Sequence, residues 1–311
     1  MSDASVEASE KYIAAESLLM KKGLFKKPDP EAAAALFVKA ANLFKIAKNY
    51  DRAGEAFHKA SIAFQQIKDQ SSTTTNLNNA INCYNLSDPS KSTALLEELI
   101  KASAAAGKFL QAGKACVQQA EKLEEAMNYV EARKVYERAV ELLQAENNAD
   151  SDLRAAQQKV AEILAMREKE YLKAAKLYEE IGTKCLKIKL LQFHSRNFFF
   201  LAFLCVMLLD DEIALEDCNN KYNQLDPNLE GSAEGDFMKE TIEAIQQKSG
   251  DKYITAYAKL NQRANLRGNN LVKTLIGEGQ GMFKEEQDEQ DAFGGEEQPA
   301  QNNAEDDDGM L

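Results

Sequence analysis

The sequence predicts an all-α protein, a tetratricopeptide-like α-solenoid of antiparallel helix pairs followed by a C-terminal helical bundle and a disordered acidic tail. Three observations predict this class. The composition favours helices, because Trp is absent and only five Pro occur among 311 residues. Apolar residues recur at helical spacings of three and four positions. The same aromatic and small-residue pattern restarts at intervals of about 40 residues, which is typical of helical repeats that bury their faces by stacking on one another.

The N-terminal segment, residues 1–30, is predicted to hold one helix and a loop. The helix covers residues 9–22, where apolar residues line one side. The loop, residues 23–30, places bulky apolar side chains inside a lysine cluster, which suits the surface of an anionic bilayer. A Leu/Phe pair tucked under the next helix explains the same pattern. The candidate membrane-contact residues are Leu24, Phe25, Lys26 and Lys27.

Helical repeats are predicted over residues 31–225, and the first pair of helices occupies residues 31–67. Asp51 is placed to cap the second helix of this pair. Alanines let the two helices approach closely, and phenylalanines fill the space between them. The predicted buried stripe comprises Leu36, Ala40, Phe44, Ala47, Ala53, Phe57, Ala60, Phe64 and Ile67.

Later copies follow the same pattern. They begin at Tyr129 and Tyr171, and a degenerate copy begins near Asp88. Two polar stretches, residues 71–75 and 146–152, are interpreted as loops between helices.

A compact helical bundle is predicted for residues 226–276. Its helices cover residues 236–248 and 252–276, and the glycines of residues 277–281 are predicted to end the second one. Residues 277–311 are rich in Glu, Asp, Gln and Gly, so this tail is predicted to be disordered.

Charge is concentrated at the end of the chain. Residues 284–311 hold eleven acidic residues and one Lys, a net charge of −10 out of −12 for the whole chain. The remaining body is nearly neutral and can carry basic and acidic faces side by side.

The sequence predicts neither a secretory signal nor a membrane span. Residues 1–10 are polar, and the longest apolar run, residues 198–209, is too short to cross a bilayer. We interpret that run as a buried helix. Five cysteines without a CxxC pair indicate reduced, buried thiols in the cytosol.

The residues give no support for catalysis. The only histidines, His58 and His194, lie in different repeats, and no phosphate-binding GxxxxGK[ST] motif occurs. We therefore expect no enzyme activity, no metal, no cofactor and no small-molecule substrate. Residues 108–176 instead carry twelve Lys and Arg, which predict either a positive surface for an acidic, elongated partner or a solvated face. Nucleic acid is disfavoured, because no aromatic residues alternate with the basic ones.

Several stretches resemble one known family. Residues 40–50 (AANLFKIAKNY) and 53–57 (AGEAF) resemble the first repeat of the soluble NSF attachment proteins, the SNAP family, and most of all its alpha type. Residues 173–183 (KAAKLYEEIGT) and 196–200 (RNFFF) are similar to the family's Tyr-Glu-x-x-Gly and Lys-Asp-Tyr-Phe-Phe stretches. The likeness covers residues 9–276.

The resemblance implies a non-enzymatic adaptor that is cytoplasmic and peripheral on membranes. Members of this family wrap the assembled SNARE four-helix bundle through a basic concave face. Their C-terminal region recruits and stimulates the hexameric AAA+ ATPase NSF, which pulls the bundle apart in vesicle fusion and intracellular trafficking. The alternative is a TPR-type scaffold that binds another protein or a peptide ligand.

The resemblance also implies sites. The loop with Leu24 and Phe25 matches the family's membrane-attaching loop. A further family lysine falls on Ala155, so the neighbouring Arg154 is expected to shift the basic patch. The implied SNARE-binding residues are Lys108, Lys114, Lys159, Arg154 and Arg196. The implied NSF contacts are Asp210 and Glu243, together with an apolar contact supplied either by the helix end at Leu275 and Ile276 or by Met310 and Leu311.

Overall fold

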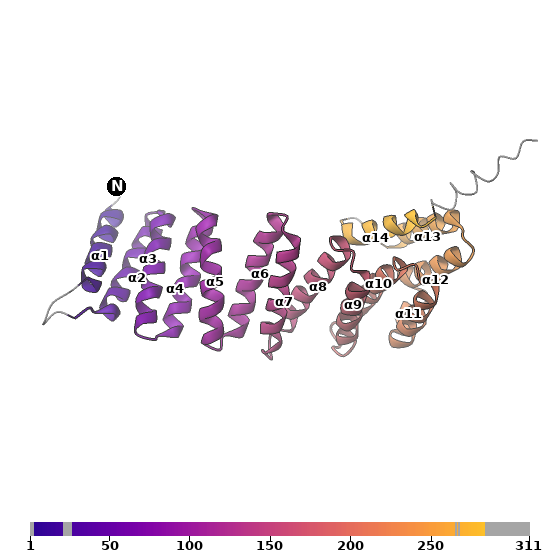
Figure 1. The fold of residues 1–311 in the computed structure, drawn as a ribbon, viewed down its shortest axis with the longest axis horizontal. Coiled ribbons are helices and arrows are strands. Elements are labelled where there is room, and N and C mark those ends of the chain that lie inside the picture. The colour runs from indigo at the N-terminus through magenta and orange to yellow at the C-terminus, as the bar shows by residue number, and fades with distance from the viewer. Residues whose placement is uncertain (1–2, 21–26, 265, 267, 284–311) are drawn as a thin grey trace, which may run out of the picture. The chain divides into compact units, whose positions relative to one another are not determined.

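The computed structural model describes residues 3–20, 27–264, 266 and 268–283. All regular structure in those residues is helical, with fourteen α-helices and one short 3-10 helix (Figure 1). Two compact units are present, residues 1–177 and 178–311, and the division falls within one helix. The predicted all-α class with stacked helix pairs is confirmed.

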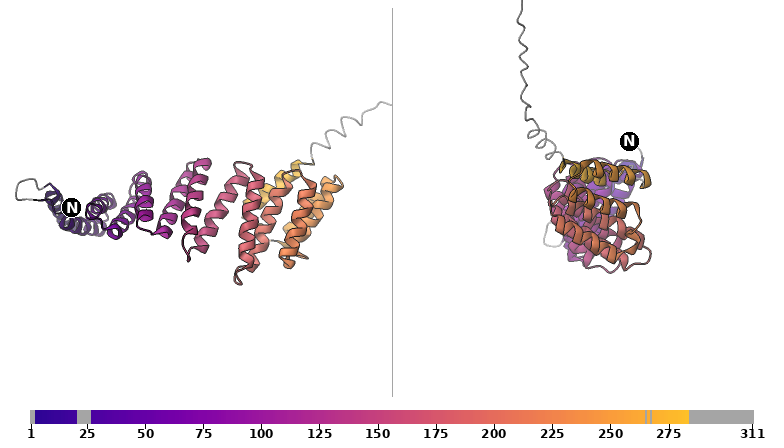
Figure 2. Two further views of the ribbon diagram at one scale, coloured as in Figure 1. Left: turned by 60° about the horizontal axis from the view of Figure 1, so that its bottom comes forward. Right: turned by 90° about the vertical axis from the view of Figure 1, so that its right-hand side faces the viewer.

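The first unit is a row of helices, each packed mainly on the helix before it and the helix after it (Figure 2). Its helices are α1 (Asp3–Leu19), α2 (Pro30–Ile46), α3 (Tyr50–Gln66), α4 (Gln70–Asn85), α5 (Pro89–Ala105), α6 (Phe109–Glu125), α7 (Tyr129–Gln144), α8 (Asp150–Met166) and the first part of α9 (Tyr171–Leu186). Polar side chains also join helices two apart. Tyr12 Oη of α1 donates to Glu55 Oε1 of α3 (2.6 Å), and Lys159 Nζ of α8 donates to Glu124 Oε2 of α6 (3.0 Å). Odd-numbered helices therefore form one layer and even-numbered helices the other.

Small residues explain how closely these helices pack. The buried face of α2 and α3 consists of Ala33, Ala34, Phe37, Ala40, Ala41, Phe44, Ala53, Ala56, Phe57, Ala60 and Ala63. Four positions of the predicted stripe are not fully buried. Leu36, Ala47 and Phe64 are only partly buried, whereas Phe37 beside Leu36 is fully buried. Ile67 is 38% exposed because it lies at the C-cap, beyond the last turn of α3.

Several turns between helices share one arrangement, the Schellman motif. The residue after the C-cap adopts a left-handed conformation, with φ of 56° at Lys48, 69° at Gly107 and 59° at Met127. The next N–H donates to the carbonyl five residues earlier, as in Asn49 N to Phe44 O (2.8 Å). Asn49 then caps the following helix, since its side chain accepts from Arg52 N. A three-residue connection thus reverses the chain.

Replacing Met127 with glycine is expected to stabilise the first unit by about 0.5–1 kcal/mol. Its left-handed backbone strains any residue that has a Cβ, and its side chain is 77% exposed, so little packing is lost. The urea midpoint, followed by far-UV circular dichroism, should rise. The reverse change, Gly107→Met, should lower it, because Gly107 is also left-handed and its Cβ position is open. A lower midpoint for Met127→Gly would contradict the prediction.

The polar stretch at residues 71–75 is not a loop, contrary to the prediction. It forms the first turns of α4, which is capped by Asp69 Oδ1 accepting from Ser72 N (3.0 Å). Thr73 and Thr74 are buried, and their hydroxyls donate to the carbonyls of Asp69 (2.7 Å) and Ser71 (3.0 Å). These side chains satisfy themselves on the helix backbone, so a hydroxyl-rich sequence can occupy a helix interior. α4 carries no charged residue.

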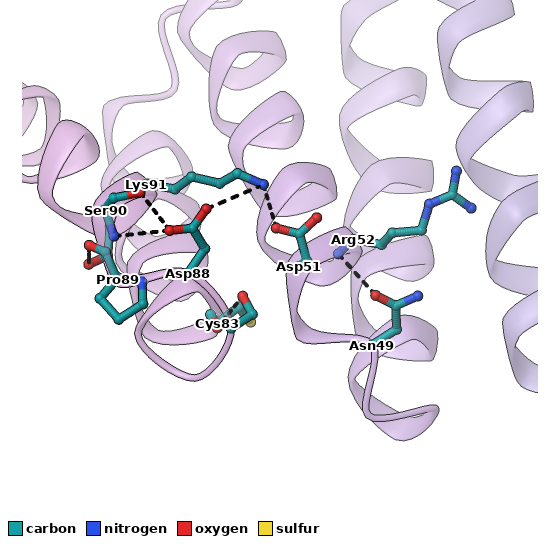
Figure 3. Close-up of polar contacts among 10 residues, drawn as sticks. Asn49, Asp51, Arg52, Cys83, Asp88, Pro89, Ser90 and Lys91 are labelled. Atoms are coloured by element: carbon teal, nitrogen blue, oxygen red, sulfur yellow. Dashed lines mark hydrogen bonds and ion pairs between the residues drawn. The ribbon is translucent and has the colours of Figure 1, made fainter.

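An ion pair joins α5 to α3 (Figure 3). Asp88 Oδ1 accepts from Ser90 N (3.1 Å) and caps α5. Lys91 Nζ lies 2.5 Å from Asp51 Oδ1 and 4.0 Å from Asp88 Oδ2. The hydrogen bond to Asp51 raises the pKa of Lys91. Asp51 was predicted to cap α3, but Asn49 does so, which leaves Asp51 to pair with Lys91.

The second unit is built around one apolar helix. Its elements are the rest of α9, α10 (Gln192–Met207), α11 (Glu212–Leu225), the 3-10 helix η1 (Pro227–Leu229), α12 (Ala233–Gln246), α13 (Gly250–Arg263) and α14 (Asn270–Gly281). Residues 198–207 of α10 are all buried, as predicted for that run. Rings extend this core, with Phe199 stacked on Tyr222 at 4.9 Å between centroids.

The C-terminal helices differ from the prediction in two ways. The helix predicted over residues 252–276 is two helices, because the chain turns between α13 and α14. Gly277 and Gly279 do not end the helix but lie within α14, whose last residue is Gly281. Gly279 is needed there for close packing, since a Cβ would meet the Met207 side chain and lie 2.7 Å from Tyr253 Oη. The predicted division into residues 1–30, 31–225, 226–276 and 277–311 stays a prediction.

Alkaline pH is expected to weaken the fold through its cysteines, which are all free and buried as predicted. Burial raises the pKa of Cys116 to about 11 and of Cys205 to about 12, from an ordinary value of 9.0. Above pH 9.0 the unfolded chain releases thiol protons that the folded chain keeps, so the free energy of unfolding falls as pH rises. Urea midpoints should decline between pH 9 and pH 11. A flat profile would contradict this expectation.

Within the described residues, no helix combines the length and the apolar character needed to cross a membrane.

Candidate functional site

The first unit brings four of the predicted basic residues into one layer. Lys108 is the N-cap residue of α6, and Lys114 lies one turn into that helix. Arg154 and Lys159 lie on α8. Both helices belong to the even-numbered layer, so the chain presents these side chains from neighbouring helices of the same layer.

Each of the three lysines also bridges two helices. Lys108 Nζ donates to Ser71 Oγ (3.2 Å) and Thr74 Oγ1 (3.0 Å) of α4. Lys114 Nζ lies 3.4 Å from Asp152 Oδ2 of α8. These contacts are partly solvent-exposed, which leaves the ammonium groups able to exchange partners.

Lys159 lies deepest of the three. Burial disfavours its charged form and is the largest single effect. The hydrogen bond to Glu124 and the nearby carboxylates of Glu162 and Glu121 together outweigh it, and they raise the pKa of Lys159 above its ordinary value of 10.5. Lys159 therefore remains protonated at neutral pH. Its side chain is still 40% exposed, so it can meet a partner.

Two adjoining grooves run along this layer. The α4–α6 groove has a volume of about 560 Å³ and is lined by Lys108 and Lys114. The α6–α8 groove, of about 570 Å³, is lined by Lys114 and Lys159. Arg154 lines neither groove. The acidic residues that line them are Glu121, Glu146, Asp152 and Glu162. The predicted basic face is therefore a face of mixed charge.

Arg196 belongs to the second unit. It lies on α10, and its Nε is 3.4 Å from Glu234 Oε2 of α12. Its side chain is 38% exposed and so is partly accessible.

The predicted NSF contacts in the second unit differ in exposure. Asp210 is exposed in the turn between α10 and α11, with φ of 56°. Glu243 is exposed on α12 and lines a groove of about 310 Å³ that does not include Asp210. Leu275 is 0% exposed, because it packs into the core from α14, and it offers no surface to a partner. Met310 and Leu311 lie outside the described residues.

The predicted membrane-contact residues are mostly outside the described part of the chain. Leu24, Phe25 and Lys26 fall there, whereas Lys27 is described and exposed.

Among the described residues, neither histidine belongs to a group of side chains that could bind a metal ion. His58 Nε2 lies 3.2 Å from Glu98 Oε2, and His194 is exposed in the first turn of α10. Nowhere in the described residues do three or more His, Cys, Asp or Glu side chains gather to hold a metal ion.

The helix array and its basic residues match one known family along most of the chain. The profile of the soluble NSF attachment protein, SNAP, matches residues 3–268. The chain belongs to the SNAP family. This membership makes it a non-enzymatic adaptor, as predicted, and supports a SNAP-type role in vesicle fusion.

Named SNAP proteins match at similar levels. The beta-soluble NSF attachment protein of Bos taurus is 29% identical over 286 residues, which cover 88% of this chain and 93% of that protein. The alpha-soluble NSF attachment protein of Mus musculus is 30% identical and the vesicular-fusion protein SEC17 of Komagataella phaffii is 29% identical, each covering 73% of this chain and 76% of the relative. The alpha and beta types match almost equally, so the SNAP family is assigned without a subtype.

The amide side chains that line the α4–α6 and α6–α8 grooves were not predicted from the sequence. Asn78 and Gln111 line the α4–α6 groove, and Gln118 lines both grooves. The spacing along α6 could have indicated two of them. Gln111, Lys114 and Gln118 recur at intervals of three and four positions and so share one polar face. The pairing of Asp152 with Lys114 and of Glu124 with Lys159 was not predicted either, because each pair joins two different helices.

Proposed function

We propose that this SNAP protein binds assembled SNARE complexes through its even-numbered layer and recruits and stimulates the AAA+ ATPase NSF, in the cytoplasm and peripherally on membranes. One observation carries the proposal. Lys108, Lys114 and Lys159 line two adjoining grooves formed by successive helices of one layer. A rod-shaped partner with acidic stripes can contact such a series of positions along its length.

The mixed charge of the grooves favours a partner of defined pattern. Lys114 and Asp152 lie side by side, so a ligand must offer an acidic group to one and tolerate the other. Charge complementarity of this kind contributes more to specificity and orientation than to affinity. A four-helix bundle presents a fixed pattern of surface charges, whereas a single free helix does not hold one.

The test compares an assembled SNARE bundle with one free SNARE helix, each immobilised at matched density. We expect the chain to bind the bundle at least tenfold more tightly and, once bound, to raise the ATPase rate of NSF. Equal or stronger binding of the free helix would support the alternative, a TPR-type scaffold for peptide ligands. The amides of Asn78, Gln111 and Gln118 favour that second candidate, because they can bond an extended backbone.

For NSF, the proposed contacts are the exposed carboxylates of Asp210 and Glu243 and the apolar end of the chain at Met310 and Leu311. The burial of Leu275 supports assigning that apolar contact to Met310 and Leu311. Deleting Met310 and Leu311 should abolish NSF stimulation while SNARE binding is kept. Unchanged stimulation would overturn this part of the proposal.

For the membrane, the proposed contact is the segment with Leu24, Phe25, Lys26 and Lys27. A chain with Leu24 and Phe25 both changed to Ser should co-sediment less with vesicles containing phosphatidylserine than the unaltered chain does. Equal co-sedimentation would reject this segment as the contact.

A further inference from the structure

The turn between α9 and α10 of the second unit displays the two most exposed large apolar side chains in the described part of the chain. Leu190 is 87% exposed and Phe193 is 86% exposed, and Ile188 beside them is 39% exposed. Lysines surround these apolar groups. We call this surface the α9–α10 tip, and it consists of Lys184, Lys187, Ile188, Lys189, Leu190 and Phe193.

Hydrogen bonds fix the backbone conformation of the α9–α10 tip. Leu191 N donates to Ile188 O (2.8 Å), and Gln192 Nε2 donates to Leu186 O (3.1 Å), so the turn is closed by its own hydrogen bonds. The start of α10 is anchored below it, because Ser195 Oγ donates to the buried Asp226 Oδ2 (2.6 Å). The apolar side chains therefore project from a fixed turn.

The lysines of the tip are largely uncompensated. Lys184 Nζ pairs with Glu180 Oε1 at 2.6 Å. Lys187 and Lys189 are exposed, and neither has an ion-pair partner among the described residues. An acidic segment that also carries a large apolar residue would complement this surface, because it could neutralise the ammonium groups and cover Leu190 and Phe193.

We propose that residues 284–297 of the same chain dock on the α9–α10 tip. That segment, KEEQDEQDAFGGEE, carries seven acidic residues, one lysine and Phe293. Its charge is opposite to that of the tip. Phe293 stands between Asp291 and Glu296, so one apolar ring is flanked by acids as the apolar groups of the tip are flanked by lysines.

The attachment point of this segment allows the contact. The last turn of α14 lies against the C-terminal end of α10, because Gly279 is in contact with Met207. The tip lies at the other end of α10, which has 16 residues and so a length of about 24 Å. The ten residues from Phe283 to Phe293 can span up to about 33 Å. The segment is therefore long enough, and its covalent attachment favours the contact over one with another molecule.

The inference concerns the second unit alone and does not rest on the proposed SNARE contact, so each can fail without the other.

Zero-length carbodiimide cross-linking of the full chain tests the inference, since this reagent joins only amines and carboxylates in direct contact. We expect cross-links from residues 285–297 to Lys187 and Lys189, at yields at least fivefold above those to Lys101, whose side chain is 71% exposed. The yield should fall at 1 M salt, which screens charges at this range. The variant with Leu190→Ser and Phe193→Ser keeps both lysines and should lose most of the yield.

Three outcomes overturn the inference. Cross-links spread evenly over exposed lysines, or directed mainly to Lys108 and Lys114, would show that the segment does not select the tip. An unchanged yield in the Leu190→Ser, Phe193→Ser variant would remove the apolar part of the contact. Cross-links between isotope-labelled and unlabelled chains would assign the tip to a second copy.

Discussion

Changing Lys108 and Lys114 together to glutamate is expected to weaken binding of an assembled SNARE bundle at least tenfold, about 1.4 kcal/mol. Both side chains line the α4–α6 groove, and Lys114 also lines the next groove, so the change places two negative charges where the proposed acidic partner docks. Most of the loss should appear as a slower association rate and should shrink at high salt. Surface plasmon resonance with an immobilised bundle measures both quantities.

The matched control changes the same number of charges in the other layer. Lys101 of α5 and Lys134 of α7 are exposed and pair within their own helices, with Glu97 (3.4 Å) and Glu131 (2.7 Å). Their double change to glutamate should leave bundle affinity nearly unaltered. Helical circular dichroism verifies that both variants are folded. Equal losses in the two variants would show that net charge, and not the even-numbered layer, governs binding.

Changing Gly235 to alanine is expected to destabilise the second unit by about 2–4 kcal/mol. Gly235 lies in the first turn of α12, and an added Cβ would overlap the backbone carbonyl oxygen of Leu229. That carbonyl cannot move freely, because it accepts from Ser232 N (3.0 Å) and Ser232 Oγ (2.7 Å). Leu229 is also fully buried. Urea unfolding with hydrogen exchange resolved by residue would place the loss in the second unit.

Gly277 supplies the control within the same unit. It lies inside α14, and a Cβ there would meet nothing within 4 Å. Gly277→Ala should therefore stabilise α14 by roughly 0.5–1 kcal/mol, because alanine loses less backbone entropy in a helix. Should Gly235→Ala unfold at the same urea concentration as the unaltered chain, the close approach to Leu229 would carry no energetic weight.

The fold could be predicted from periodicity, because helices that stack on their neighbours repeat the same apolar spacing. Residues 198–207 could likewise be assigned to a buried helix from their unbroken apolar run. The predictions of helix ends and loops were wrong where a residue type that usually ends a helix lies inside one. Thr73 and Thr74 usually favour caps and turns, but here their hydroxyls bond to the helix backbone. Gly279 usually ends a helix, but here it allows close packing.

The candidate site was predictable only in part. The family resemblance pointed to Lys108 and Lys114, whereas their spacing of six positions turns them about 120° apart around a helix and does not by itself place them on one face. Their carboxylate surroundings were not predictable, since Asp152 is distant in sequence and reaches Lys114 only through the packing of α8 beside α6. The burial of Leu275 depends in the same way on how α14 packs, which its own sequence does not reveal.

The neighbour-to-neighbour packing of the first unit has a mechanical consequence. Each helix packs mainly on the two beside it. Among the described residues, no helix contact therefore joins one end of the row directly to the other. A pull applied at one end would be taken up as small sliding movements at many successive interfaces. Such a row can bend and stretch elastically while its helices stay folded.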